Sequence, residues 1–382
     1  MLYINKYVGL FNPNNAHPMI ELKRTYHPIG QGAFYTEVFT NSDNTRFVMV
    51  YDCGSETAIA DMERSMDDQI DDFKQSIGPN PNIDLLFISH FHADHINGLD
   101  KLLDGVTVRK TIIPMLTSEV LLLTRVRNYL RFRDGANAAD AIIRELYYDE
   151  EHSGRFGEVV VVSPKHEGED VEEDNRNWIR NGRVLYLGEK LQYDPFWEYI
   201  PFNSITQNDQ RAIDFVNDLL QIPEAIQNEQ LNVSGLIRGF RKKVKEAYRK
   251  AMHKANDNLY SLVVESRPAE NVTPTSDARK SHALYFGDFD SKNNDALWNR
   301  FSTFFDYDTI GTIQVPHHGS KENWRDEMKE GDAREYVVSS GATNTYHHPD
   351  YWVVRSIANE GHVVHVVHEK TASMFEESFR IL

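Results

Sequence analysis

The chain has 382 residues, a single cysteine and a formal net charge of −17 at pH 7. This length suits one large domain with an insertion, or two domains. The lone Cys53 excludes an intramolecular disulfide, and no apolar run is long enough to span a membrane. The first residues, Met1–Lys6, lack the basic and apolar regions of a signal peptide, so we expect a soluble cytoplasmic protein.

Two apolar segments early in the chain predict buried strands that end in polar residues. The segment 48–51 leads to Asp52, and the segment 83–88 leads to Ser-His-Phe-His-Ala-Asp-His at 89–95. Imidazole and carboxylate are the usual non-thiolate ligands of zinc and similar ions, and packing does not explain so dense a cluster of them. We therefore interpret four residues of this motif as metal ligands, namely His90, His92, Asp94 and His95.

The spacing of the motif predicts two ions. Side chains two apart on an extended segment point the same way, so His90 and His92 can hold one ion together. Asp94 and His95 fall where the chain enters a helix, which the apolar spacing over 96–103 predicts, and they can hold a second ion. Two ions about 3.5–4 Å apart polarise both the attacked and the leaving oxygen of a substrate. The motif thus predicts a hydrolase with two divalent ions.

A long interval separates the strand predicted at 111–114 from the next apolar strand, near Asn258. Within it, apolar stretches at 121–130, 141–146 and 213–220 predict helices, and 159–162 predicts a short strand. We predict that 117–257 is a mostly helical insertion over one side of the metal site. Such an insertion would shape substrate access or contact a protein partner.

Basic residues dominate the segment 238–254, in which Glu246 is the only acidic residue. Apolar residues recur there at three- and four-residue steps, which predicts an amphipathic helix with a basic outer face. An acidic protein repels phosphate backbones, so nucleic-acid binding requires such a local basic surface. Arg241, Lys242 and Lys245 are the candidate substrate contacts. The alternative is a solvated face that balances the acidic remainder.

Three later apolar segments predict strands that end at candidate site residues: 283–286 before Asp288, 313–315 before His317 and His318, and 336–338 before the loop of His348. An ordinary histidine pKa would let His348 donate a proton to a leaving oxygen, or hold a phosphate oxygen, near neutral pH. The alternative is a turn histidine that the backbone satisfies.

These motifs resemble the metallo-β-lactamase superfamily, whose signature is H-x-H-x-D-H after a strand. The resemblance implies an α/β fold over 1–382, an αββα sandwich with its core at about 18–116 and 258–382. It implies that Asp288 bridges the two ions and that Asp52 braces the metal loop without binding metal. It also favours His317 as the last histidine ligand, with His318 as the alternative. Asp94, His318 and His348 are then the candidate catalytic residues.

Finer details resemble the hydrolase domain of DNA-uptake competence proteins of the ComEC type, namely Gly30-Gln31-Gly32, the run 316–320 and the segment 340–349. Many relatives carry a further histidine that completes the first metal site. Here that position falls near Asn258, and the sequence offers no replacement, so we expect an incomplete first site. Histidine-rich ligation favours Zn²⁺, whereas an oxygen-rich first site would tolerate Mn²⁺.

Three functions remain open, because a fold does not decide a substrate. The first is a phosphodiesterase or nuclease that uses metal-activated water. The second is a hydrolase of a small ester, thioester or lactam. The third is a partner-activated or inactive component of a multiprotein assembly, such as a bacterial defence system, which the large insertion motivates.

Overall fold

A computed structural model describes residues 20–132, 135–147, 154–169, 183–193, 195–203, 209–222, 232–252, 260–270, 272, 280–293, 295–305, 309–330 and 335–381. Asn258, the end of the basic segment at 253–254, and residues 18–19 of the predicted core lie outside the described residues.

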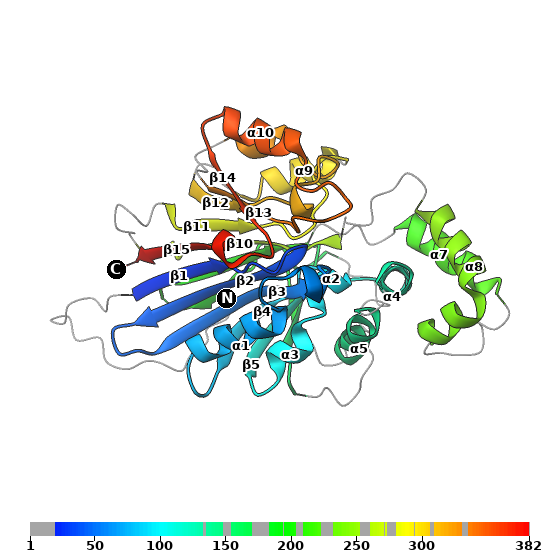
Figure 1. Ribbon diagram of the computed structural model, residues 1–382, viewed down its shortest axis with the longest axis horizontal. Coiled ribbons are helices and arrows are strands. Elements are labelled where there is room, and N and C mark those ends of the chain that lie inside the picture. The colour runs from blue at the N-terminus through cyan, green and yellow to red at the C-terminus, as the bar shows by residue number, and fades with distance from the viewer. Residues whose placement is uncertain are drawn as a thin grey trace.

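Two β-sheets lie face to face (Figure 1). The first has the strand order β15-β1-β2-β3-β4-β5-β6-β7. Its strands are β1 (Ile20–Tyr26), β2 (Gly32–Asn41), β3 (Arg46–Ser55), β4 (Asn82–Phe87), β5 (Thr107–Pro114), β6 (Glu158–Val162), β7 (Arg183–Leu185) and β15 (Phe375–Arg380). Pairing is parallel from β3 to β7 and antiparallel among β15, β1, β2 and β3.

The second sheet has the order β14-β13-β12-β11-β10-β9-β8. Its strands are β8 (Leu191–Tyr193), β9 (Trp197–Phe202), β10 (Val263–Pro268), β11 (His282–Tyr285), β12 (Ile310–Gln314), β13 (Glu335–Ser339) and β14 (Val363–Val367). Pairing is parallel from β11 to β14 and antiparallel from β8 to β11.

Helices cover the outer faces of both sheets. The α-helices are α1 (Met66–Ser76), α2 (Ala93–Ile96), α3 (Leu99–Leu103), α4 (Ser118–Arg131), α5 (Ala136–Tyr147), α7 (Gln210–Leu220), α8 (Val233–Ala251), α9 (Asp295–Ser302) and α10 (Tyr351–Asn359). Figure 1 shows α1 and α3 below the first sheet and α9 and α10 above the second. This is the predicted αββα sandwich, and the fold prediction is confirmed. Among the described residues, no helix is both long enough and apolar enough to cross a membrane.

Burial on two sides explains the continuous apolar run before the histidine motif. In β4, Leu85 and Phe87 pack into the core between the sheets, whereas Leu86 and the following Ile88 pack into the core beneath the helices. A strand buried on both faces does not alternate polar and apolar residues. The chain then leaves the sheet at Ser89 and enters the metal loop.

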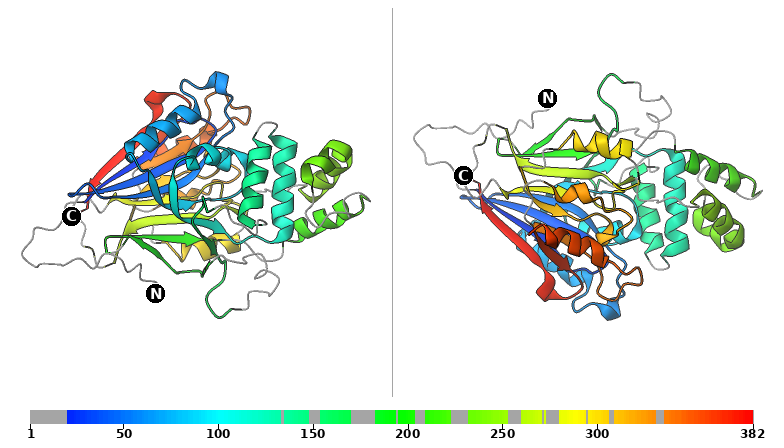
Figure 2. Two further views of the ribbon diagram at one scale, coloured as in Figure 1. Left: turned by 90° about the horizontal axis from the view of Figure 1, so that it is seen from below. Right: turned by 90° about the horizontal axis from the view of Figure 1, so that it is seen from above.

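The interval 117–257 contains the predicted helices as α4, α5, α7 and α8, which form a group beside the end of the sandwich (Figure 2). It also contains four strands that belong to the two sheets, β6, β7, β8 and β9. Two of them have only three residues, too few to give a clear pattern in the sequence. The helical additions are therefore two separate pieces, at 118–147 and 210–251, with sheet strands between them.

Candidate metal centre

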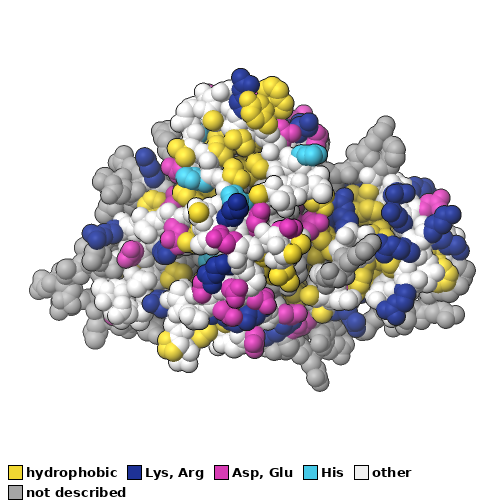
Figure 3. Space-filling model, in the orientation of Figure 1, with side chains coloured by type: hydrophobic (Ala, Val, Ile, Leu, Met, Phe, Trp, Pro, Cys, Tyr) yellow, Lys and Arg dark blue, Asp and Glu magenta, His cyan; other side chains and the backbone are white. Residues whose placement is uncertain are grey.

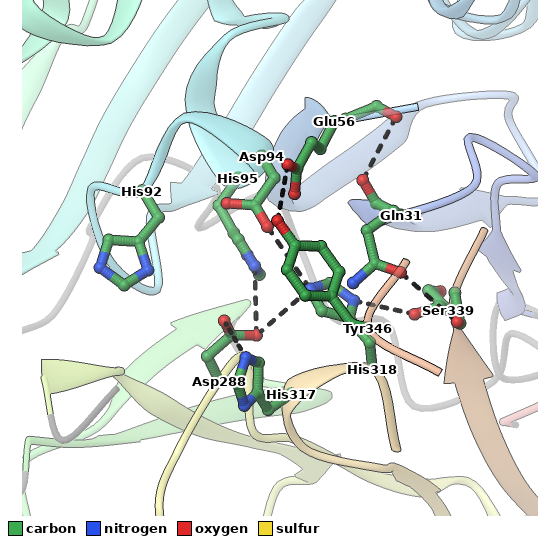
Figure 4. A network of polar contacts seen from close by, with 12 residues as sticks. Gln31, Glu56, His92, Asp94, His95, Asp288, His317, His318, Ser339 and Tyr346 are labelled. Atoms are coloured by element: carbon green, nitrogen blue, oxygen red, sulfur yellow. Dashed lines mark hydrogen bonds and ion pairs between the residues drawn. The ribbon is translucent and has the colours of Figure 1, made fainter. Parts of the chain in front are cut away.

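The candidate site residues lie in loops that follow parallel strands. Residues 90–95 follow β4, Asp288 follows β11, and His317 and His318 follow β12. Loops at the carboxyl ends of parallel strands meet at one edge of a sheet. Figure 4 shows that the loops from both sheets converge on one place, so residues far apart in the sequence become neighbours.

Besides a group formed by Asp52, His90 and His95, two clusters of buried ligand atoms lie in this place. Each has three members whose ligand atoms lie within 4.8 Å of one another, which are His90, His92 and Asp288 in the first cluster and Asp94, His95 and His318 in the second. Every member is a side chain that the sequence singled out. The division of the motif between two clusters follows the predicted spacing, with His90 and His92 in one and Asp94 and His95 in the other.

Asp288 lies between the clusters and presents one carboxylate oxygen to each. Its Oδ2 lies 3.6 Å from Nε2 of His90 in the first cluster. Its Oδ1 lies 3.2 Å from Nε2 of His95 and 3.7 Å from Nε2 of His318, both in the second cluster. Asp288 therefore has the geometry of a ligand that bridges two ions.

The adjacent histidines His317 and His318 face different clusters. Both have left-handed backbone conformations, with φ of 47° and 55°. Nε2 of His318 lies 3.5 Å from Oδ2 of Asp94, whereas Nε2 of His317 lies 3.7 Å from Oδ2 of Asp288, the oxygen that faces the first cluster. His318, the alternative to His317 as the last histidine ligand, is thus the one that lies in the second cluster, whereas His317 lies near the oxygen of Asp288 that faces the first.

Hydrogen bonds behind the ligands fix which ring nitrogen points inward. Oδ2 of Asp52 lies 2.8 Å from Nδ1 of His95 and also accepts the hydroxyl proton of Ser89, at 2.6 Å. The Ser89 hydroxyl lies 2.9 Å from Nδ1 of His90 and, because its own proton goes to Asp52, accepts from that nitrogen. Asp52 thus orients two ligands, which is how carboxylates commonly support metal-binding histidines.

His318 is oriented in the same way by the second sheet. Its Nδ1 donates to the backbone carbonyl of Ser339, at the end of β13, over 2.9 Å. That bond leaves Nε2 as the ring nitrogen that faces Asp94 and Asp288. His317 has its Nδ1 2.7 Å from Oδ1 of Asn323, so its Nε2 is also the inward nitrogen.

The buried donor set fits a pair of divalent cations. Four ligand atoms that belong to or face the second cluster are buried without a hydrogen-bond partner, which are Oδ1 of Asp94, Nε2 of His95, Oδ1 of Asp288 and Nε2 of His318. In the first cluster, Nε2 of His90 and Nδ1 of His92 lie 2.9 Å apart. A buried polar atom left unpaired costs about 1–3 kcal/mol, so a converging set of them is unfavourable unless something binds it. Imidazole nitrogens and carboxylate oxygens together suit Zn²⁺ or Mn²⁺.

The charges of the ligands differ between the clusters. Burial alone would lower the pKa of His95 and of His318, but the Asp288 carboxylate, together with the other carboxylates beside them, outweighs it and raises both, so an ion that binds there displaces protons. Burial lowers the pKa of His90 and of His92 well below the usual range, so both are neutral, the form that binds metal. Burial alone would raise the pKa of Asp288, but the attraction of His317, His95 and His318 outweighs it and lowers that pKa, so Asp288 is ionised.

Gly287 permits the close approach of the two sheets at this point. Its φ is 54°, and a Cβ atom there would lie 2.3 Å from Oγ of Ser261 and 2.8 Å from Cβ of Ser89. Any side chain would therefore push the Asp288 turn away from the metal loop. The Gly-Asp pair thus serves both the backbone and the chemistry.

His348 lies beside the centre without joining either cluster. Its ring centroid is 5.4 Å from that of His317 and 6.4 Å from that of His318. Burial, assisted by repulsion from these two histidines, lowers the pKa of His348 to about 3. Its imidazole is therefore neutral at pH 7, which favours a hydrogen bond to a substrate oxygen over the expected proton donation near neutral pH.

The structure also brings residues to the centre that the sequence did not single out. The Tyr346 hydroxyl donates to Oε1 of Glu56 over 2.8 Å, and Figure 4 shows both side chains beside Asp94 and His318. They come from loops after β13 and β3, on different sheets; Tyr346 lies within the segment 340–349 but was not singled out there, and Glu56 belongs to no motif.

Helix α4 contacts the metal loop directly. The Asn128 side chain donates from Nδ2 to the carbonyl of Phe91 over 2.8 Å and accepts from the amide of Ala93 over 3.2 Å. These bonds hold the backbone on both sides of His92. A single asparagine within an apolar helix gave no signal of this role.

The predicted substrate contacts Arg241, Lys242 and Lys245 lie away from both clusters, exposed on α8. The helix predicted for this segment is present, with Ile237, Val244 and other apolar residues on its buried face. Nη2 of Arg241 donates to the carbonyl of Leu130 near the end of α4, over 3.4 Å. The basic helix thus adjoins the helix that holds the metal loop.

Residues 42–219 match the family described as "Metallo-beta-lactamase superfamily". The match covers slightly less than half of the chain and identifies a metallo-β-lactamase superfamily domain in these residues. The superfamily prediction is confirmed at this level, and with it a metal-dependent hydrolase. The matched range runs through α4, α5 and the strands β6–β9, which agrees with the finding that part of this interval belongs to the sandwich.

Similar solved structures are remote in sequence. A long-form RNase Z from yeast is 11% identical, with a TM-score of 0.34, and the match covers 85% of this chain but only 37% of that one. Unliganded yeast PDE1 is 11% identical over 96% of this chain and 100% of that one, with a TM-score of 0.34. A diphosphatase of the PhnP family is 10% identical over 95% and 100%, with a TM-score of 0.35. No curated protein matches the chain.

Proposed function

We propose that this protein is a two-metal phosphodiesterase that cleaves nucleic acid. The observation that carries the two-metal part is the pair of adjacent buried ligand clusters, which Asp288 joins by presenting one carboxylate oxygen to each. The ligand atoms that no hydrogen bond satisfies face the second cluster. His90, His92 and Asp288 would hold one ion, and Asp94, His95, His318 and Asp288 the other.

Divalent ions held there supply a nucleophile at neutral pH by acidifying water, and they polarise the oxygens of the attacked group. The chain's own residues prepare the site for that chemistry. Asp52 keeps His95 and, through Ser89, His90 in the orientation that turns Nε2 inward. The neutral His348 imidazole is available to donate a hydrogen bond to a phosphate oxygen. Asp94 and Asp288 supply the negative charge that balances the cations.

His317 is our candidate to complete the first site in place of the histidine that many relatives carry. Its Nε2 faces the same oxygen of Asp288 as His90 does. It stands outside the three-member cluster, so it would bind more weakly than His90 or His92. We therefore propose Zn²⁺ for the second site and Zn²⁺ or Mn²⁺ for the first.

The basic face of α8 supports nucleic acid as the substrate. Arg241, Lys242 and Lys245 are exposed. Figure 3, which has the same orientation as Figure 1, shows Lys and Arg side chains gathered over α8. Such a patch within a protein of net charge −17 is a local site for phosphate groups. The resemblance to competence proteins of the ComEC type, which handle DNA, supports the same substrate class.

The test is hydrolysis of bis(p-nitrophenyl) phosphate, and of labelled single- and double-stranded DNA and RNA, with Mn²⁺, Zn²⁺ or EDTA. The control is the variant His92→Ala/Asp288→Ala. We expect metal-dependent cleavage that the variant lacks.

Hydrolysis of p-nitrophenyl acetate or nitrocefin without any cleavage of phosphodiesters would overturn the proposal in favour of a small-molecule hydrolase. No activity on any of these substrates, with Zn²⁺ bound, would favour the partner-activated alternative. The group formed by α4, α5, α7 and α8 would then be the surface to test for partner binding.

A further inference from the structure

Exposed aromatic side chains are concentrated in one short segment. Among the described residues, every exposed Phe, Tyr or Trp lies within 346–352: Tyr346 at 44% exposure, Tyr351 at 65% and Trp352 at 63%. Other described aromatic residues are buried or half-buried. Large apolar side chains in contact with water indicate a binding surface when they cluster.

Tyr351 and Trp352 form an ordered unit with a cation. They begin α10, their ring centroids lie 5.5 Å apart, and the rings meet at 69°. One turn later, the guanidinium of Arg355 lies 5.8 Å from the Tyr351 centroid and 5.7 Å from the Trp352 centroid. We call these three residues the α10 platform. Figure 3 shows hydrophobic and basic side chains together at the upper edge of the molecule, over α10.

The α10 platform adjoins the metal centre along the chain. Trp352 is four residues after His348, a reach of at most about 14 Å of extended backbone. Tyr346 precedes His348 by two residues and lies near it, because the two ring centroids are 5.9 Å apart. The loop of residues 346–350 therefore connects the ligand region directly to the platform.

Positive charge also lies next to the platform. A pocket of about 500 Å³ beside Trp352 is lined by the cations Lys292, Lys321 and Arg325 and by the carboxylates Asp326 and Glu327, so positive charge exceeds negative charge there by one. Arg325 is paired with Asp295, and Nζ of Lys321 lies 3.7 Å from Oδ2 of Asp350. Lys321 is half exposed and follows the ligand loop of His318 by three residues. A strand whose phosphate reaches the metal centre would thus meet a cation and then exposed aromatic faces.

We infer that the α10 platform stacks an unpaired base of a single-stranded nucleic acid whose phosphate lies at the metal centre. The inference rests on the proposed function and narrows its substrate to strands with accessible bases. Any base has a face that can stack on Trp352 or Tyr351, and the guanidinium adds a cation–π contact and charge. Bases of a duplex are already stacked within the helix, so a duplex gains nothing from the platform.

The test is equilibrium binding of a fluorescent 12-nucleotide strand, the same sequence as a duplex, and a strand with abasic sites, all in EDTA so that nothing is cleaved. The variants are Tyr351→Ala/Trp352→Ala and the aromatic-retaining Tyr351→Phe/Trp352→Phe. Val363→Ala, which removes another exposed apolar side chain, from β14, is the matched control.

We expect the alanine variant to bind the intact single strand about 5- to 100-fold more weakly, the range for loss of one stacked base. The phenylalanine variant and Val363→Ala should bind as the wild type does, and the abasic strand should bind wild type and alanine variant alike.

Unchanged affinity of the alanine variant for the single strand would contradict base stacking on the α10 platform. The same holds if the variant loses as much affinity for the duplex and the abasic strand as for the intact single strand. Hydrolysis of bis(p-nitrophenyl) phosphate is measured on the same protein preparations in separate samples with Zn²⁺ or Mn²⁺ and without EDTA. If that activity persists in wild type that binds no strand, the platform and the nucleic-acid substrate both fail while the metal-dependent phosphodiesterase stands.

Discussion

Two buried polar clusters in the same sandwich differ in how their atoms are satisfied. Between the sheets, Glu37 accepts from Nε of Arg24 at 2.7 Å, from the hydroxyls of Tyr285 and Tyr199, each at 2.8 Å, and from Oγ of Ser266 at 2.7 Å. The remaining Arg24 nitrogens donate to Glu377 and to a backbone carbonyl. At the metal centre, by contrast, the inward atoms of four side chains have no hydrogen-bond partner.

The difference distinguishes buried polar groups that stabilise the fold from buried polar groups that are arranged to bind a ligand. A buried network that satisfies itself keeps the two sheets in register and needs no ligand. A buried cluster that orients its ligands from behind and leaves their inner atoms unpaired is arranged for something else to bind. By burial and charge alone, Arg24 and Glu37 would be as good candidates for functional residues as Asp288.

The largest effect is expected from Asp288→Ala. Loss of the bridging carboxylate removes several kcal/mol of transition-state stabilisation, so kcat/KM for bis(p-nitrophenyl) phosphate should fall about a thousand-fold. In EDTA, the free energy of unfolding in urea should change by only about 1 kcal/mol or less, because the neighbouring histidines can lose their protons and avoid an unpaired charge. A loss of stability as large as that expected below for Glu37 would mean that the centre is structural.

Glu37→Gln should show the opposite pattern. The change leaves the buried Arg24 guanidinium without its principal partner, and breaking a buried pair costs about 3–5 kcal/mol. Urea unfolding should register that loss, while Zn²⁺ affinity below the unfolding transition stays unchanged. Glu376→Gln is the matched control, because its ion pair with Lys23 is half exposed and worth about 1 kcal/mol or less. Equal losses in the two variants would contradict this view of the network.

The contrast also explains what the sequence could reveal. The motif at 90–95 is contiguous because one loop supplies both clusters, and Asp288 and His318 each follow a recognisable strand, so nearly the whole centre could be predicted. The Glu37 network draws on β1, β2, β9, β10 and β11, and no local pattern records such a contact. Glu56 and Tyr346 escaped prediction for the same reason, since they meet only when the two sheets pack.

The choice between His317 and His318 depends on a different kind of information. Two adjacent histidines have the same context in a sequence, and only the left-handed backbone at both positions decides which oxygen of Asp288 each one faces. Within the interval 117–257, the prediction missed β7 and β8, which are too short to show a period, and also the six-residue β9. In both cases the deciding information is backbone geometry.

A smaller effect is expected from Asp52→Asn, which tests the support behind the ligands. The amide cannot accept from His95 and Ser89 as the carboxylate does, so Zn²⁺ affinity should fall about 10- to 100-fold, as for other supporting carboxylates. Chelator competition measures it. Asp84→Asn is the control, because Asp84 is a buried carboxylate of β4 that accepts from the amide of Val48 and contacts no ligand. If Asp84→Asn weakens Zn²⁺ binding as much, the effect is one of stability and not of orientation.

The smallest effect per residue is expected on the basic face of α8. Charge reversal at Arg241, Lys242 and Lys245 should weaken binding of a single strand and lower the slope of log K against log salt by about 2, since each lost phosphate contact accounts for about 0.7. Hydrolysis of bis(p-nitrophenyl) phosphate should not change, because that substrate is too small to reach α8 from the metal centre.

The control reverses Arg46, Arg109 and Lys370, which are exposed elsewhere, and so makes the same change in net charge. If both triple variants bind equally weakly, the effect comes from the overall charge of the protein and α8 is only a solvated face. A loss confined to the α8 variant would place the strand along α8 and, through the contact of Arg241 with α4, next to the loop that holds His92. The substrate would then contact the metal ligands and the helical group at once. The Glu37 network, whose members hydrogen-bond to one another, offers no such contact to a ligand.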